Sequence, residues 1–560
     1  MYILVRDPEL LSSVKDELQP QKPLFVDTET CVEYGKTDGG LYGKVRLIQI
    51  YQGGWHAAFI LDCFFLGLEP VLNLIKDFHH VYHNASYDLH TINCHTDSTW
   101  LPRKVDDTFY LSKSVFSDKD KFDFYSCLDY AGVSDKNIAG IDKKENQKAE
   151  WGKNLTKTML KYAAMDVLYL YLLYEQVKQG DDEAYDLDIA NLRYAIHYDR
   201  RGIPMNRKAI NDLRCKYLTE LEKYKALIPC NINSPKQCKE WLGSDGTDRE
   251  VLGIMSLNGN TDAENLIQAR KHDKGLMFIN KYDGERIKGF HNSCGARTSR
   301  MTCNGGDRFF YENNQNPPRQ IFPCIEAPEG KTIVYKDYSG LELRVTVAYV
   351  GEPTMAKLMI EGKDLHTYTG CEIFGETPET LTKGQRLITK FFNFGLAYGA
   401  GAPTLQGLLQ ARGQIQISLA EVRELKRKWL EYYHYFKEWH DMHRKHFQVY
   451  GYIDTITGLG RTIRATRLTD SYNFPIQGTA AEAVKLGVHY LHTRYGEDPE
   501  IINVVHDSVA MLHPLEDADK WIERLNECMI DSWYYVIKDL AIPDLPMPAE
   551  AQHNNVWVFE

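Results

Sequence analysis

The chain has 560 residues, of which 43% are hydrophobic and 26% are charged, which excludes disorder as its main state and predicts roughly three or four domains. No stretch approaches the roughly 18 consecutive apolar residues of a membrane helix, so we expect no membrane partner. The net charge is −11, which argues against a strongly basic protein but leaves room for local basic grooves that bind nucleic acid. The 12 cysteines are scattered, and the first residues lack the apolar core of a signal peptide, so we expect reduced thiols and a cytoplasmic location.

The first third of the chain is predicted to form an α/β unit. Residues 24–30 and 45–52 are β-rich and are separated by a glycine-rich turn, whereas 71–76 and 155–176 show helical periodicity. The acidic, polar stretch at 179–188 marks a boundary, so we assign residues 1–185 to this unit.

The rest of the chain alternates between helical and loop-rich parts. Residues 186–235 and 379–448 are helical in pattern, and the second stretch is rich in Lys and Arg. Gly, Asn and Pro are dense over 291–330, which indicates loops and short strands. Residues 331–340 read as a strand that runs into a turn.

Carboxylates cluster by spacing within the first unit. Two of them lie two apart on a predicted strand and therefore share a face, and another is four residues from a tyrosine on a predicted helix. Hard oxygen ligands at this density predict Mg²⁺ or Mn²⁺, with two ions suited to phosphodiester cleavage. The tyrosine could orient the attacking water. The residues concerned are Asp27, Glu29, Asp88, Tyr162 and Asp166, with Asn84 four residues before Asp88.

A second set of candidates lies in the last half. Asp337 ends a predicted strand, although it could equally be a turn residue beside a helix N-cap. Residues 501–514 read as a hairpin with Asp507 at its tip, and the two aspartates together would make a metal site for phosphoryl transfer. Four side chains at i, i+4, i+8 and i+12 place two cations and two aromatic rings along one helical stripe, which suits a triphosphate and a base better than an ordinary core stripe. These are Arg386, Lys390, Phe394 and Tyr398.

In the first unit, the order DxE, NxxxD and YxxxD resembles the DEDD 3′–5′ exonucleases with tyrosine in the third motif, which include polymerase proofreading domains. The resemblance covers about residues 20–180. Segments 106–116 and 145–151 also resemble this family.

The second half resembles the family A, or polymerase I-like, DNA polymerases. The motifs A, B and C of that family are matched by DYSGLELR (337–344), RLITKFFNFGLAYG (386–399) and VVHDS (504–508). Segments 231–237, 294–300, 313–319, 471–485 and 551–557 fit the same family in the same order. Together the two resemblances span nearly the whole chain.

The resemblance implies a role for each matching residue. Asp337 and Asp507 would bind two catalytic ions, and Arg386 and Lys390 would contact the triphosphate, with Lys390 a proton donor to pyrophosphate. Glu342 would be the gate that rejects a ribose 2′-hydroxyl. Phe394 would lie against the sugar, which implies poor use of dideoxynucleotides, and Tyr398 near the templating base. Contacts to nucleotide, primer or template would come from His506, Arg297 (with Arg300 as the alternative), Gln315, Asn316, Asn473 and Gln477, and in the exonuclease from Asn84.

Two positions depart from the family pattern. Gly340 stands where glutamine is usual, which removes a hydrogen-bonding side chain near the nucleotide. Ser508 stands where glutamate is usual, so a third acidic residue is missing from the polymerase site.

The resemblance implies an α/β exonuclease with an RNase H-like mixed sheet, followed by an α+β right-hand polymerase. We expect the thumb at 186–290, the palm at 291–378 and 449–560, and the fingers at 379–448. The expected function is DNA-directed DNA synthesis with 3′–5′ proofreading by a monomeric, replicative enzyme of compact phage type in a bacterial or phage-infected cytoplasm. Its partners would be primer–template DNA and dNTPs, with a helicase, primase or single-strand-binding protein as further candidates. The alternatives are a repair polymerase, an exonuclease whose second half only binds DNA, and a single-subunit RNA polymerase.

Overall fold

The computed structural model describes residues 1–31, 43–133, 151–178, 182–281, 284–304, 313–317, 319–413, 415–548 and 551–557. Its N-terminal unit is built on a six-stranded mixed sheet of order β1-β4-β3-β2-β5-β6. The pairs β1/β4, β2/β5 and β5/β6 are parallel, and β2/β3 and β3/β4 are antiparallel. The strands are β1 (Tyr2–Val5), β2 (Leu24–Cys31), β3 (Lys44–Tyr51), β4 (Ala58–Asp62), β5 (His79–Tyr82) and β6 (Lys104–Asp107).

Helices cover this sheet, and the predicted helix at 155–176 is present as α8 (Lys157–Val177), whose first turn is capped by the Thr156 side chain. Helix α8 packs across β2, β3 and β4. The others are α1 (Pro8–Glu17), α2 (Cys63–Leu66), α3 (Leu68–Ile75), α4 (Ala85–Asn93), α5 (Thr108–Val115) and α6 (Phe124–Tyr130). The expected glycine-rich turn at 37–43 and the 145–151 segment fall almost entirely outside the described residues.

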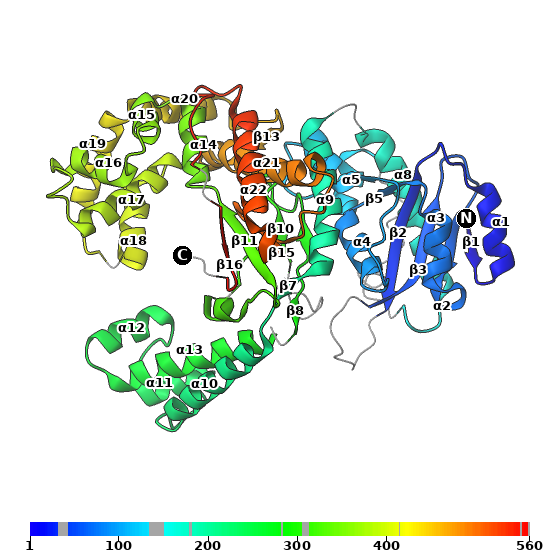
Figure 1. Cartoon of the computed structure of the whole chain (residues 1–560), viewed down its shortest axis with the longest axis horizontal. Helices are drawn as coiled ribbons and strands as arrows, with labels where there is room; N and C mark the ends of the chain where they lie inside the picture. The colour runs from blue at the N-terminus through cyan, green and yellow to red at the C-terminus, as the bar shows by residue number, and fades with distance from the viewer. Residues whose placement is uncertain are drawn as a thin grey trace.

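Helix α9 (Glu183–Arg201) joins the N-terminal unit to the rest of the molecule (Figure 1). Leu192 and Ile196 on α9 belong to the N-terminal core, whereas Ala195 and Tyr198 belong to the large C-terminal core. Helix α9 therefore packs against both units, and our assignment of residues 186–201 to the thumb stays a prediction. A helix with apolar residues on two sides has the same sequence pattern whether it lies in an arm or between two domains.

A helical arm projects from the body of the molecule (Figure 1). It contains α10 (Arg207–Lys225), α11 (Pro235–Leu242), α12 (Arg249–Leu257) and α13 (Thr261–Lys281), with α10 and α13 packed along each other. Gly275 allows this contact, because a Cβ there would lie 2.2 Å from the Tyr217 ring. The short strands β7 (Ile203–Pro204) and β8 (Arg286–Ile287) pair at its base.

An antiparallel sheet of order β14-β15-β11-β16 occupies the centre of the molecule. Its strands are β11 (Lys331–Asp337), β14 (Ile501–Val505), β15 (Ser508–Pro514) and β16 (Gln552–Asn554), so the predicted strand and hairpin are both present. Helix α22 (Ala518–Ile537) packs on this sheet and against α21 (Leu468–Arg494). Smaller elements nearby are β9 (His291–Asn292), β10 (Thr302–Cys303), η2 (Arg319–Cys324), β12 (Ile453–Ile456), β13 (Thr462–Ala465) and η3 (Leu515–Asp517).

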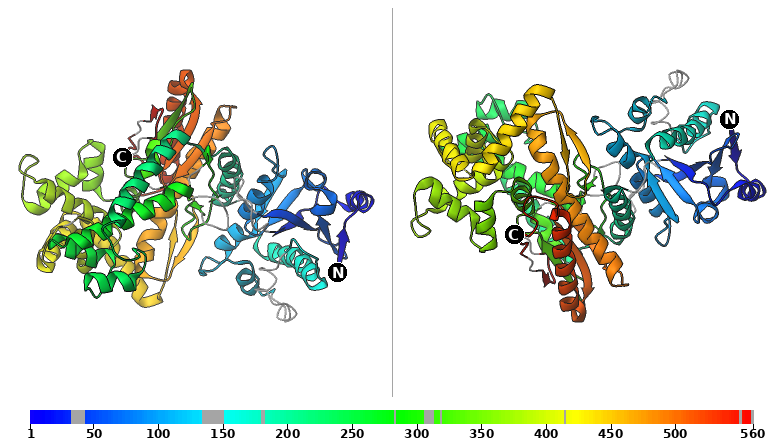
Figure 2. Two further views of the ribbon diagram at one scale, coloured as in Figure 1. Left: turned by 90° about the horizontal axis from the view of Figure 1, so that it is seen from below. Right: turned by 90° about the horizontal axis from the view of Figure 1, so that it is seen from above.

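A second helical group lies on the side of the central sheet away from the N-terminal unit (Figures 1 and 2). It comprises α14 (Leu341–Val350), α15 (Pro353–Ile360), α16 (Leu365–Phe374), α17 (Lys383–Ala397), α18 (Ala402–Gly413), α19 (Leu419–Tyr432) and α20 (His434–Tyr450). Helix α16 packs against α17 and α19, and the fingers boundary at 379 stays a prediction. Among the described helices, none combines the length and apolarity needed to cross a membrane.

Candidate active sites

The carboxylates predicted in the first unit do meet. Asp27 and Glu29 project from β2 and Asp166 from α8, and their nearest oxygen atoms all lie within 4.8 Å of one another. Asp88, in the first turn of α4, is buried beside them, and its Oδ1 accepts a 2.6 Å hydrogen bond from the Thr28 hydroxyl. Period-two spacing on the strand and the fold of α8 over the same sheet account for this convergence.

Burial and mutual repulsion make these carboxylates bind a proton or a metal cation more readily. Burial raises the pKa of Asp27 from 3.8 to about 7. Burial, followed by repulsion from Asp27, Asp166 and Asp88, raises the pKa of Glu29 well above its usual value. Hard carboxylate oxygens held this close together fit Mg²⁺ or Mn²⁺, and binding such an ion would remove the repulsion.

Two tyrosines flank Asp166. Tyr162 lies one helical turn before it on α8, and burial followed by the Asp166 charge raises the pKa of this phenol well above its usual value. Tyr125 of α6 donates a 3.1 Å hydrogen bond to Asp166 Oδ1. Sequence reasoning missed Tyr125, because it belongs to none of the three motifs and only the fold brings it to the cluster.

Asp337 and Asp507 form the second site, at one end of the central sheet. Asp337 is the last residue of β11, Asp507 lies in the tight turn between β14 and β15, and Tyr338 N donates to Asp507 O at 3.1 Å. Partial burial and the neighbouring Asp507, with which it shares a hydrogen bond, raise the pKa of Asp337 to about 7. Two carboxyl groups that compete for one proton also suit a divalent cation.

A charged network adjoins the aspartates. Glu342, in the first turn of α14, pairs with Arg300 Nη1 at 3.0 Å and accepts a hydrogen bond from the Tyr398 hydroxyl. His506 lies in the β14–β15 turn with a positive φ of 51°. Burial and then the Arg300 charge lower its pKa, so this imidazole is biased to the neutral form.

Helix α17 carries the predicted stripe, and Tyr398 is its C-cap. Arg386 makes a two-point contact with Asp364 at 2.8 and 2.9 Å. Lys390 is exposed, and the Phe394 ring lies 5.9 Å from that of His366. The stripe is therefore partly open to solvent and continues into the Glu342 network.

The residues predicted to touch DNA differ in how far they are exposed to solvent. Gln315 is buried, with its amide 3.5 Å from Val504 O, whereas Asn316 is exposed. Gln477 on α21 accepts from Thr298 at 3.5 Å, and the Oδ1 of Asn473 on the same helix is buried with no hydrogen-bond partner among the described residues. Asn84 precedes α4 in the left-handed conformation.

Of the two candidate arginines, Arg300 rather than Arg297 reaches the Glu342 network. Arg297 instead donates to backbone carbonyls of the loop that follows α5, at Lys119 and at Ser117 (2.6 Å), and to Arg464 O at 3.2 Å. Sequence alone could not separate them, because both lie in one short arginine-rich segment.

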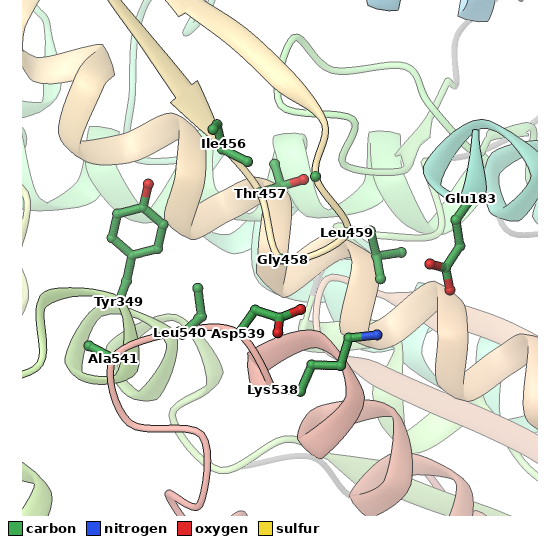
Figure 3. A pocket seen from close by; sticks show the side chains of 11 residues that line it. Glu183, Tyr349, Ile456, Thr457, Gly458, Leu459, Lys538, Asp539, Leu540 and Ala541 are labelled. Atoms are coloured by element: carbon green, nitrogen blue, oxygen red, sulfur yellow. The ribbon is translucent and has the colours of Figure 1, made fainter. Parts of the chain in front are cut away.

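Figure 3 shows a further pocket, with a volume of about 520 Å³. It is lined by the β12–β13 turn, by residues 538–541 directly after α22, and by Tyr349 and Glu183, with Lys538 and Asp539 supplying further charge. None of the predicted site residues borders this pocket.

Comparison with known proteins identifies the architecture. Residues 208–558 match the family model described as DNA polymerase family A. The chain belongs to this family. Residues 2–179 match the model described as 3′-5′ exonuclease, which confirms the mixed-sheet exonuclease followed by a family A polymerase.

Among relatives of this family A polymerase, DNA polymerase I of Aquifex aeolicus is 27% identical, with 99% of each chain covered. DNA polymerase I of Chloroflexus aurantiacus is 26% identical over 68% of this chain, which spans 45% of that relative. The fold also matches a solved structure described as the POL domain of Pol1 from M. smegmatis in complex with DNA primer-template and dNTP, with a TM-score of 0.72 and 16% identity over 100% of this chain and 99% of that one.

Proposed function

We propose that this family A polymerase extends a primer 3′-hydroxyl with dNTPs and removes mispaired primer ends with its own 3′–5′ exonuclease. The observation that carries the proposal is the presence of two separate carboxylate sites in one chain, Asp337 with Asp507 and Asp27 with Glu29 and Asp166. Bound Mg²⁺ or Mn²⁺, with two ions at each site, would supply the Lewis acidity for phosphoryl transfer.

At the polymerase site, Arg386 and Lys390 would bind the triphosphate, with Lys390 also able to protonate the leaving pyrophosphate. Binding would require Arg386 to exchange Asp364 for phosphate, which is a small cost because both groups are largely exposed. Phe394 would pack against the sugar and Tyr398 near the templating base.

Glu342 would set the choice of sugar. Arg300 and the Tyr398 hydroxyl hold its carboxylate from two sides, so it cannot easily move away from a ribose 2′-hydroxyl. A fixed group rejects an extra substituent more strongly than a mobile one. This favours deoxynucleotides over the alternative of a single-subunit RNA polymerase.

At the exonuclease site, Tyr162 would orient the attacking water beside Asp166, and Tyr125 would hold that carboxylate in place. Asn84, Gln315, Asn316, Asn473, Gln477 and His506 are proposed to contact DNA or nucleotide. The arm α10–α13 is the proposed thumb, the central sheet the palm, and the group around α17 the fingers.

We further infer a replicative role for this polymerase, supported by the presence of a candidate synthesis site and a candidate excision site in one chain. A 5′-labelled primer on a longer template, with Mg²⁺, tests the activity. Extension with dNTPs and shortening without them are expected. Shortening under both conditions would instead support an exonuclease whose second half only binds DNA.

A further inference from the structure

One short segment of the chain runs between the two carboxylate sites. We call residues 291–300 the connecting segment. Near its beginning, Asn292 Nδ2 donates a 2.9 Å hydrogen bond to Asn84 Oδ1, at the start of the helix that carries Asp88. At its end, Arg300 pairs with Glu342 at 3.0 Å. The position of Arg300 therefore depends on how this segment is held.

The exonuclease unit holds the first half of the connecting segment. The Ser86 hydroxyl donates to His291 O at 2.9 Å. The Tyr110 hydroxyl donates to Asn292 Oδ1 at 2.9 Å and accepts from the Ser293 hydroxyl at the same distance. All of these groups except Asn84 are buried, so each bond lies where water cannot replace it.

Lys113 of α5 makes the central contact. Its ammonium group donates to three consecutive carbonyls of the segment, at Cys294, Gly295 (3.3 Å) and Ala296 (2.9 Å). Lys113 is only 8% exposed, and burial lowers its pKa. Charge-assisted bonds to three successive carbonyls fix the curvature of that backbone. The turn is tightly packed, because a Cβ at Gly295 would lie 1.8 Å from Thr302 Oγ1.

The second half of the segment is held from the polymerase side. Lys485 of α21 donates to Ser299 O at 2.5 Å, and Ser299 adopts a positive φ of 59°. Such a backbone conformation costs a non-glycine residue energy and persists only where neighbours enforce it. The residue that follows it is Arg300, so both ends of this turn determine where its guanidinium points.

We propose that Lys113, a residue of the exonuclease unit, is a positioning residue for the polymerase site: by fixing the connecting segment it places Arg300 against Glu342. The inference rests on the proposed function of Glu342 in sugar selection. Loss of Lys113 should free the exonuclease side of the turn that carries Arg300, loosen the ion pair between Arg300 and Glu342, and weaken the rejection of ribonucleotides.

Lys113→Met in the full chain tests this, with single-nucleotide incorporation of dNTP and rNTP as the readout. The ratio of kcat/KM values for dNTP over rNTP should fall about tenfold, because this factor corresponds to the free energy of one charge-assisted hydrogen bond. Hydrolysis of single-stranded DNA should stay within about twofold, because Lys113 does not belong to the carboxylate cluster. Lys113→Arg should restore most of the selectivity, and the exposed Lys121→Met is the matched control that should change neither activity.

A double-mutant cycle with Arg300→Ala separates positioning from general destabilisation. If Lys113 acts through Arg300, adding Lys113→Met to Arg300→Ala should change selectivity by less than about twofold. The inference would be overturned if the two substitutions lowered selectivity by independent factors that multiply in the double variant. It would also be overturned if Lys113→Met left selectivity unchanged. If Lys113→Met does not fold, Tyr110→Phe removes a single hydroxyl that holds the same segment at Asn292 and Ser293, and it should shift selectivity in the same direction. A wild-type protein that incorporates no nucleotide would refute the proposed function instead.

Discussion

Replacing Asp27 by Asn should stabilise the metal-free protein at alkaline pH. Burial raises the pKa of Asp27 from 3.8 to about 7. In the unfolded chain such an acid ionises at its ordinary pKa, whereas in the folded protein it ionises only near its raised pKa. The free energy of unfolding therefore falls as pH rises between these two pKa values and stays constant above the higher one. At 1.36 kcal/mol per pKa unit the full shift corresponds to about 4 kcal/mol, and we expect about half because the titrations of Asp27 and the neighbouring Asp88 depend on each other.

Thermal unfolding of the full chain in EDTA measures this effect. A gain of about 2 kcal/mol should raise the midpoint of the exonuclease transition by about 4–8 °C. The difference from wild type should grow between about pH 4 and about pH 7 and then level off. Excess Mg²⁺ should reverse the order, because only the wild-type cluster keeps its full ligand set.

The exposed Asp97→Asn serves as the control, since it removes the same charge from the same unit outside the cluster. A variant less stable than wild type at alkaline pH without metal would refute the reasoning. So would an equal gain from the control, because that would assign the effect to net charge.

Three further outcomes are expected. Glu342→Ala should admit ribonucleotides about a hundredfold more readily while leaving exonuclease activity unchanged, as measured by single-nucleotide kinetics; unchanged selectivity would contradict the gate. Arg386→Ala should raise the KM for dNTPs about tenfold with little change in melting temperature, since its pair with Asp364 is exposed; a large stability loss would argue against a substrate role. Gly340→Ala should cost about 1 kcal/mol in denaturant titration, because its φ is +61° although space is open around it; a neutral result would show that the turn readjusts.

The site residues that could be predicted from the sequence are those whose positions follow from the local geometry of a strand, turn or helix. Asp27 and Glu29 share a face because strand side chains alternate, and Asp507 reaches a turn because two apolar runs flank it. The α17 stripe follows from helical periodicity in the same way. In each case the informative residues lie within a few positions of one another.

What the sequence could not supply depends on contacts between distant segments. Helix α9 contributes to two cores, which its periodicity could not reveal. Tyr125 reaches Asp166 only because α6 and α8 pack together. Arg297 and Arg300 are three residues apart, yet the carbonyls of the Ser117–Lys119 loop bind one and Glu342 binds the other. Local patterns do not contain this information.

The most direct test of two independent active sites is a reciprocal pair of variants on one labelled primer–template. Asp507→Asn should abolish extension and retain primer shortening, whereas Asp27→Asn should abolish shortening and retain extension. The separation is expected because Asp27 lies on β2 of the six-stranded sheet and Asp507 in the β14–β15 turn of the central sheet, each with its own carboxylate partners. Loss of both activities in either folded variant would contradict the account.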